Sequence, residues 1–263
     1  FVASQFRAET GGSIGTPPDR LEVSLDVAAI AASGGISLAE NDTLIIDSLA
    51  ATTARVIADG TTTDVDDAAL ADLSAGADVL LTVLAGDLTV ADGDGDLVGL
   101  VGVGLGHVLI DVQSGNVAAS AALGATDGDL TLSASGDVTL EGTAGIGASG
   151  TILIEAGGAL AMAAELGIAT DGANVRIDAG GDVLLSLVDA RTNADRIAGT
   201  IADQSNWGDV SISSGGNFED ASADDLLTDV FANALRISTV GVTGRLLPQD
   251  VNAIETEGGS LSV

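Results

Sequence analysis

The chain has 263 residues, and its 39 acidic residues against 8 basic ones give a formal net charge of −31 at pH 7. All of the basic residues are arginine. So acidic a chain argues against nucleic acid and anionic membranes as partners, because both carry negative charge themselves. The absence of cysteine excludes disulfides and thiolate sites. No apolar run approaches the roughly 20 residues of a membrane-spanning helix, so no membrane span is expected.

The first part of the chain is predicted to be irregular over residues 1–20 and then to form strands. From Leu21 to Val27 every second residue is aliphatic, and this alternation predicts a strand with one buried face. Three further segments continue the strand pattern: residues 35–38, 44–46 and 49–57.

Residues 59–78 interrupt this pattern. The segment carries three consecutive threonines and several aspartates, and residues 68–73 have the composition of a helical turn. We expect a loop insertion that bulges from the rest of the fold, with strands resuming at residues 79–84 and 88–90.

Three alternating aspartates, Asp92, Asp94 and Asp96, follow these strands. Carboxylates at this spacing can reach one hard cation, as in a calcium-binding loop. The match to an EF-hand loop is poor, because Leu97 and Val103 stand where glycine and a bidentate glutamate are needed. The sequence therefore leaves two interpretations open, a calcium site or a solvated acidic turn.

A repeat of about 22 residues runs through residues 106–181. Successive lines of this repeat begin at Gly106, Gly128 and Gly150. Each line holds a run of alternating aliphatic residues, such as Leu130 and Leu132, then two shorter runs separated by small residues. A period near 20 residues with small residues at the corners is typical of a solenoid.

Three short strands joined by tight corners make one coil of a parallel β-helix. The fold class is therefore predicted to be all-β, a parallel β-helix (β-solenoid) with about 22-residue coils that stack at ~4.8 Å. Residues 1–263 are predicted to form a single solenoid segment with two loop insertions. Four Phe, one Trp and no Tyr are compatible with a narrow bore.

Most corners carry glycine followed by Asp or Asn. We interpret these pairs as turns in which glycine adopts a positive φ and the Asp or Asn side chain bonds to its own backbone. An edge of stacked carboxylates that binds metal is the alternative. The corner glycines are Gly86, Gly115, Gly128, Gly136, Gly181, Gly208 and Gly216.

A second insertion is predicted over residues 188–207. It carries Arg191, Arg196 and Trp207, the only tryptophan. Such a segment is either a recognition loop or a cover with Trp207 packed against one face of the solenoid. Farther along, residues 224–237 fit either a short amphipathic helix or two strands.

The end of the chain resembles its beginning. Residues 26–38 are echoed at 250–263, where an Asp-Val-x-Ala-Ile segment, a glycine pair and a short strand recur in the same order. If this echo is a repeat, the chain is an excerpt of a longer tandem array.

Four low-complexity segments resemble giant bacterial surface exoproteins, the large adhesins related to filamentous haemagglutinin. They are Gly12–Thr16 with Leu21–Val23, Leu38–Asp42, Ala85–Val90 and Ala179–Leu185. The resemblance implies a parallel β-helix, an extracellular location at the bacterial cell surface, and a role in adhesion, biofilm or fibre building. No catalytic residue is implied, because the matching motifs are structural.

We therefore expect a structural or adhesive extracellular rod that stacks end to end through open solenoid edges, with copies of itself or neighbouring repeats as partners. The alternative is a β-helix protein that binds or degrades host or matrix polysaccharide. Enzymes of that kind need paired carboxylates or a base beside a metal, whereas lysine is absent and His107 stands alone. We expect no enzyme activity and no required cofactor, with calcium as the one candidate ion.

Overall fold

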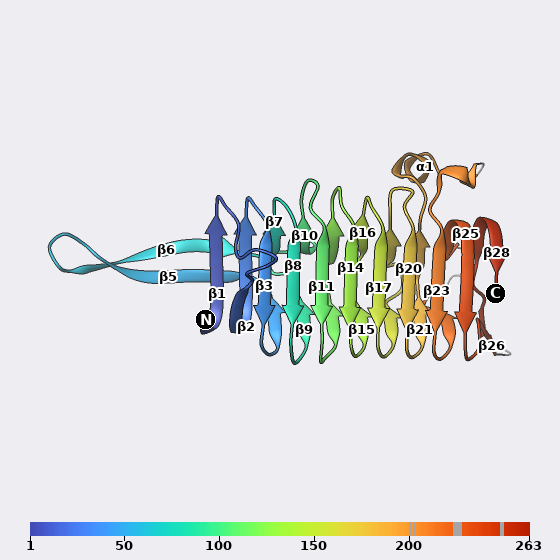
Figure 1. Ribbon diagram of the computed structural model, residues 1–263, viewed down its shortest axis with the longest axis horizontal. Helices are drawn as coiled ribbons and strands as arrows, with labels where there is room; N and C mark the ends of the chain where they lie inside the picture. The colour runs from blue at the N-terminus through green and yellow to red at the C-terminus, as the bar shows by residue number, and fades with distance from the viewer. Residues whose placement is uncertain (200, 202, 223–227, 248–249) are drawn as a thin grey trace.

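The computed structural model describes residues 1–199, 201, 203–222, 228–247 and 250–263, and it folds most of them into one parallel β-solenoid. The strands run across the long axis of a rod, and the two termini lie toward opposite ends of it (Figure 1). This architecture confirms the predicted fold class. No helix among the described residues is long and apolar enough to cross a membrane.

The coils are built from three rows of parallel strands that share a 24-stranded sheet. The first row contains β3 (Ile36–Glu40), β8 (Val79–Val83), β11 (Val108–Val112), β14 (Leu130–Ala134), β17 (Ile152–Ala156), β20 (Val175–Ala179) and β23 (Val210–Ser214). The second row contains β4 (Leu44–Ile46), β9 (Leu88–Val90), β12 (Val117–Ala119), β15 (Val138–Leu140), β18 (Leu160–Met162), β21 (Val183–Leu185) and β24 (Phe218–Asp220).

The third row contains β7 (Leu73–Ala75), β10 (Val98–Gly102), β13 (Ala122–Ala125), β16 (Ile146–Ala148), β19 (Gly167–Ala169) and β22 (Leu187–Asp189). Four longer strands extend across rows near the two ends of the rod: β1 (Val2–Thr10), β2 (Leu21–Ala32), β25 (Val230–Thr239) and β28 (Thr256–Ser262). β26 (Arg245–Leu247) and β27 (Asp250–Asn252) form a separate antiparallel pair.

Aliphatic ladders fill the bore of the rod. Leu130 pairs with Val108 in one neighbouring coil and with Ile152 in the next, so these coils repeat every 22 residues. In the first row one ladder consists of fully buried residues: Ile110, Leu132, Ile154, Ile177 and Ile212. Each such side chain stabilises the fold by about 1.5–3 kcal/mol relative to an exposed one. The bore also accepts one ring, because Phe218 is completely buried.

Corner glycines are needed mainly for close approach between coils, which corrects the expectation of positive φ. Among the predicted corner positions only Gly86 has a positive φ, of 83°. At Gly128 an added Cβ would lie 2.2 Å from the carbonyl oxygen of Gly106 in the preceding coil. Stacking at strand-to-strand distance leaves no room for a side chain there.

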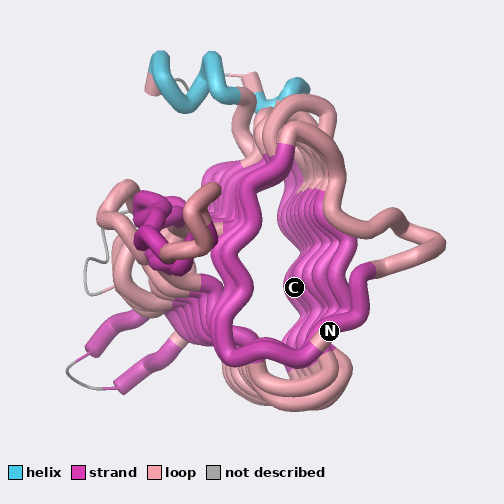
Figure 2. Tube along the Cα trace, turned by 90° about the vertical axis from the view of Figure 1, so that its left-hand side faces the viewer, coloured by secondary structure: helices cyan, strands magenta, loops and turns pink. Residues whose placement is uncertain are grey.

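The first insertion is a β-hairpin, not the loop expected over residues 59–78. β5 (Leu49–Val56) and β6 (Thr62–Leu70) pair antiparallel, so residues 49–57 leave the solenoid and residues 68–70 are strand rather than a helical turn. Residues 73–75 already belong to the third row. The hairpin extends along the rod axis past β1 (Figure 1) and lies outside the ring of solenoid strands in the end view (Figure 2).

The second insertion leaves one corner of the rod between β22 and β23. It contains helix α1 (Asn193–Ala198) and the 3-10 turn η1 (Gln204–Asn206), which lie outside the ring of strands (Figure 2). Trp207 is 4% exposed and packs edge-on against Phe231, with ring centroids 6.2 Å apart. This packing agrees with the interpretation of the segment as a cover.

The structure decides two sequence predictions near the ends of the rod, for residues 1–20 and 224–237. Residues 2–10 form strand β1, so the start of the chain is not irregular, because it pairs in register with β2. Residues 230–237 are part of β25 rather than a helix, and residues 223–227 of the predicted 224–237 segment lie outside the described residues. A column is a series of residues that pair with one another from coil to coil. Ile36 and Leu261, which correspond in the echoed segments, lie in the same column of the first row.

Candidate functional site

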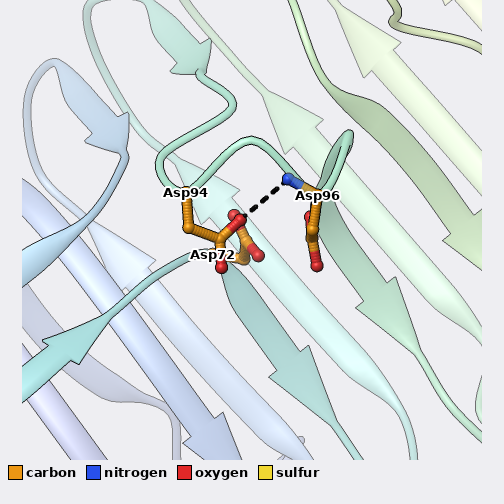
Figure 3. Close-up of side chains that lie close together, drawn as sticks. All are labelled: Asp72, Asp94 and Asp96. Atoms are coloured by element: carbon orange, nitrogen blue, oxygen red, sulfur yellow. Dashed lines mark hydrogen bonds between the residues drawn. The ribbon is translucent and has the colours of Figure 1, made fainter.

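A cluster of three carboxylates lies where the base of the hairpin meets a corner of the rod. Asp94 and Asp96 stand on the turn between β9 and β10, and Asp72 stands between β6 and β7. One carboxylate oxygen from each of the three lies within 4.8 Å of the others. Figure 3 shows the Asp72 side chain beside those of Asp94 and Asp96.

Asp72 is the buried member of this cluster. The residue is 7% exposed, and its Oδ1 has no hydrogen-bond partner among the described residues. The backbone has a left-handed φ of 67°, which Asp tolerates better than most residues. Its carbonyl accepts a hydrogen bond of 2.8 Å from the N–H of Ile30, which fixes the residue against the neighbouring coil.

The environment of Asp72 disfavours its ionised form. Burial, with the negative charges of Asp96, Asp94, Asp92 and Asp47 in that order of influence, raises the pKa of Asp72 to about 7. A carboxylate in this position is stabilised either by a proton or by a cation.

The three aspartates predicted from the sequence have different roles in the turn. Asp92 Oδ1 accepts hydrogen bonds from the N–H groups of Gly95, at 2.8 Å, and Leu97, at 3.3 Å. It therefore shapes the turn and is not part of the close cluster. Asp94 and Asp96 also accept backbone N–H groups through Oδ1, at 3.1 and 2.8 Å, while their carboxylates approach Asp72.

Asp72 could not be predicted as part of this cluster, because the hairpin interrupts the repeat just before it. The next residue, Leu73, pairs with Leu100, so Asp72 occupies the corner one coil away from the Asp94 turn. Between the second-row strand β4 and the third-row strand β7, the chain leaves the solenoid from Leu49 to Leu70 to form the hairpin. No 22-residue spacing therefore links Asp72 to the preceding coil.

A second carboxylate group lies near the C-terminal end of the rod. Asp220 and Asp229 are each 2% exposed and lie with Glu255 so that one oxygen of each is within 4.8 Å of the others. Burial, with the charge of Asp220 beside it, raises the pKa of Asp229 to about 7, although Asp229 Oδ2 accepts the Glu255 N–H at 2.9 Å. None of these three residues lies in a motif that the sequence predicts as a site.

Other polar groups are used within the fold. His107 Nδ1 accepts a hydrogen bond of 3.1 Å from the N–H of Asp129, so this histidine belongs to a corner. In the second insertion Asp189 Oδ2 lies 2.6 Å from Arg191 Nη2 and 3.0 Å from Arg196 Nε. Burial would raise the pKa of Asp189, but these hydrogen bonds and the charge of Arg196 hold it below its usual range.

The two end strands present open edges. Within the described residues β1 pairs only with β2, and β28 pairs only with β25. Both strands contribute to the third row and share one column that runs through the whole rod. Its members are Glu9, Ala31, Ser74, Val101, Gly124, Gly147, Ala169, Asp189, Phe231 and Glu257.

No protein-family model, curated protein sequence or solved structure matches this chain.

Proposed function

We propose that this chain is a rigid structural segment of an extracellular filament or adhesin, and that it stacks end to end through the open edges of β1 and β28. The supporting observation is that the two edges occupy the same column of the third row. Moving one copy along the axis places Thr256 to Gly258 beside Ala8 to Thr10 of the next copy, as parallel strands. An unpaired edge is a ready template for such pairing.

The hairpin supports the same arrangement. A two-stranded hairpin is marginally stable by itself in water, and most residues of β5 and β6 are exposed. Because it projects past β1 outside the ring of strands, it leaves the end of the rod open (Figure 2). It would lie along the flank of a neighbouring copy and gain a packing surface there.

The location at a bacterial cell surface, and an adhesive role, rest on the resemblance of the strand and corner motifs to filamentous haemagglutinin-related adhesins. A strongly acidic chain without cysteine is compatible with that setting. The neighbour in the stack is a second copy or an adjacent repeat of the same polypeptide.

Charge at the two edges provides the test. Stacking places Glu257 beside Glu9, so these like charges oppose the contact. We expect Glu257→Arg to lengthen the assemblies seen by electron microscopy and analytical ultracentrifugation at low salt. The double variant Glu9→Arg/Glu257→Arg restores like charges and is expected to return to wild-type behaviour.

Salt provides an independent check on the same contact. Wild-type association is expected to increase from 0.01 to about 0.15 M ionic strength, since screening weakens the repulsion between Glu9 and Glu257. If all three proteins remain short, monodisperse particles under every condition, the chain does not stack through these edges and the proposal is wrong.

A further inference from the structure

The corner at Asp72 contains a buried acceptor that the fold leaves unused. Asp72 is more than nine-tenths buried, and its Oδ1 has no hydrogen-bond partner among the described residues although the group lies beside two other carboxylates. Buried polar atoms in folded proteins are almost always satisfied, so an unused carboxylate oxygen aimed at a polar cluster indicates a missing partner.

The neighbours of Asp72 narrow the identity of that partner. The four charged groups with the largest influence on Asp72 are all carboxylates, Asp47, Asp92, Asp94 and Asp96, so a partner other than a proton must bring positive charge. Each carboxylate has room for more than one interaction, and the backbone N–H groups that Asp94 and Asp96 accept are both bound by Oδ1. We propose that Asp72, Asp94 and Asp96 bind one calcium ion.

The donor set fits calcium better than other common metals. All three ligands are carboxylate oxygens, whereas zinc and copper sites usually include histidine or cysteine. Asp94 and Asp96 are exposed, so water can complete a coordination shell of 6–8 oxygens at about 2.3–2.6 Å, as calcium requires. Magnesium gives up its water reluctantly and prefers one or two carboxylates in an ideal octahedron, so three clustered carboxylates suit calcium better.

The ion would join two segments that are distant in sequence. Asp72 lies between β6 of the hairpin and β7 of the third row. Asp94 and Asp96 belong to the turn that leads into β10. That turn already packs on the preceding corner, because a Cβ at Gly93 would lie 2.5 Å from the backbone nitrogen of Ser48. Calcium would therefore fix the base of the hairpin to the body of the rod.

Calcium titration of the full chain tests this proposal. Protein stripped with chelator is titrated with calcium chloride at pH 8 by isothermal calorimetry, and melting temperatures are recorded with and without the ion. Asp72→Asn is expected to weaken binding at this site at least ten-fold. Its melting temperature without calcium is expected to equal or exceed that of the wild type, because Asn fits a left-handed backbone and removes a buried charge.

Two matched variants locate the ion. Asp137→Asn removes one charge from a distant corner and is expected to leave calcium binding unchanged. Asp229→Asn alters the other carboxylate group and is also expected to leave the Asp72 site intact. The proposal is overturned if Asp72→Asn binds calcium like the wild type, if the wild type binds none, or if only Asp229→Asn loses the ion.

Discussion

At the scale of single residues, the corners of this rod are held by side chains that bond to the next coil. Asp137 Oδ1 accepts the N–H of Ala159 at 2.7 Å, and Asn116 Oδ1 accepts the N–H of Asp137 at 2.8 Å. The expected turn chemistry is therefore between coils and not within one turn. Both Asp and Asn occur at these positions because each supplies the acceptor oxygen, and the Asn116 amide also donates to Asp87 Oδ1 at 3.1 Å.

Replacing Asp137 should show whether its hydrogen-bond acceptor or its negative charge stabilises the corner. Asp137→Ala loses the bond to Ala159 and is expected to lower the free energy of unfolding by about 0.5–1.5 kcal/mol. Asp137→Asn keeps an acceptor and removes one negative charge, so its stability should match or exceed that of the wild type. Urea unfolding followed by circular dichroism measures both, and equal losses in the two variants would contradict the role of the acceptor oxygen.

Two glycines offer a test of close approach. An added Cβ at Gly157 would lie 2.1 Å from the carbonyl oxygen of Ser135, whereas at Gly147 nothing lies within 4 Å. Gly157→Ala is expected to destabilise the rod by about 1–3 kcal/mol or more, because the backbone of a packed coil must shift. Gly147→Ala should be neutral or stabilise by up to about 1 kcal/mol through the unfolded chain. Thermal melts measure both variants. If the melting temperature changes in the same direction in both, the spacing between coils is not what requires glycine at position 157.

At the scale of elements, the second insertion is held by a buried ion-pair network. Asp189 is 2% exposed and lies between Arg191 and Arg196, and Arg191 also stacks 3.7 Å above the centroid of the Phe231 ring. The insertion therefore covers the corner next to β25 and is anchored by charge as well as by Trp207. Its outer residues, such as Ile197, remain available to solvent.

Removing one arginine should be costly here. Arg191→Ala leaves the buried Asp189 carboxylate without its closest cation, and we expect a loss of about 3–5 kcal/mol. Arg176→Ala is the control, because Arg176 is exposed and its partner Asp178 is only half-buried, so this pair should contribute less than about 1 kcal/mol. Denaturant unfolding compares them, and a similar small loss in both would show that Arg196 alone satisfies Asp189.

Elements with a local signal could be predicted from the sequence. The aliphatic ladders between residues 106 and 181 repeat at 22 residues, so the solenoid and its strands followed directly. The hairpin did not, because Leu49 to Val56 directly follows the strand pattern of residues 44–46, and only its antiparallel partner shows that it leaves the rod. Asp94 and Asp96 were found from their spacing, but coil stacking brings Asp72 to them across 22 or more residues, and it brings Glu255 to Asp220 and Asp229 in the same way.

At the scale of the whole molecule, buried carboxylates and a charge of −31 set the response to pH. The pKa values of Asp72 and Asp229 are raised to about 7, mainly by burial. The folded state therefore holds these protons over a range in which the unfolded chain has already lost them. This contribution to stability is complete below about pH 4 and is lost as the pH rises through about 7.

The melting temperature in chelator and low salt is therefore expected to fall between pH 5 and pH 8. Asp189 acts in the opposite direction, but its lowered pKa places that effect below about pH 4. The variant Asp72→Asn/Asp229→Asn should show a clearly smaller fall, which differential scanning calorimetry can measure. An unchanged slope in this variant would assign the pH response to general repulsion among surface carboxylates.

The orientation of the strands also determines how the rod would respond to pulling. Because the strands lie across the long axis, the hydrogen bonds between coils run along it, and tension on the two ends loads each coil boundary directly (Figure 1). Boundaries of this kind open one at a time, beginning at an end. Each opened coil of 22 residues, as between Leu130 and Ile152, releases roughly 75 Å of extended chain. Such a rod would dissipate mechanical work in repeated small steps instead of breaking at a single force.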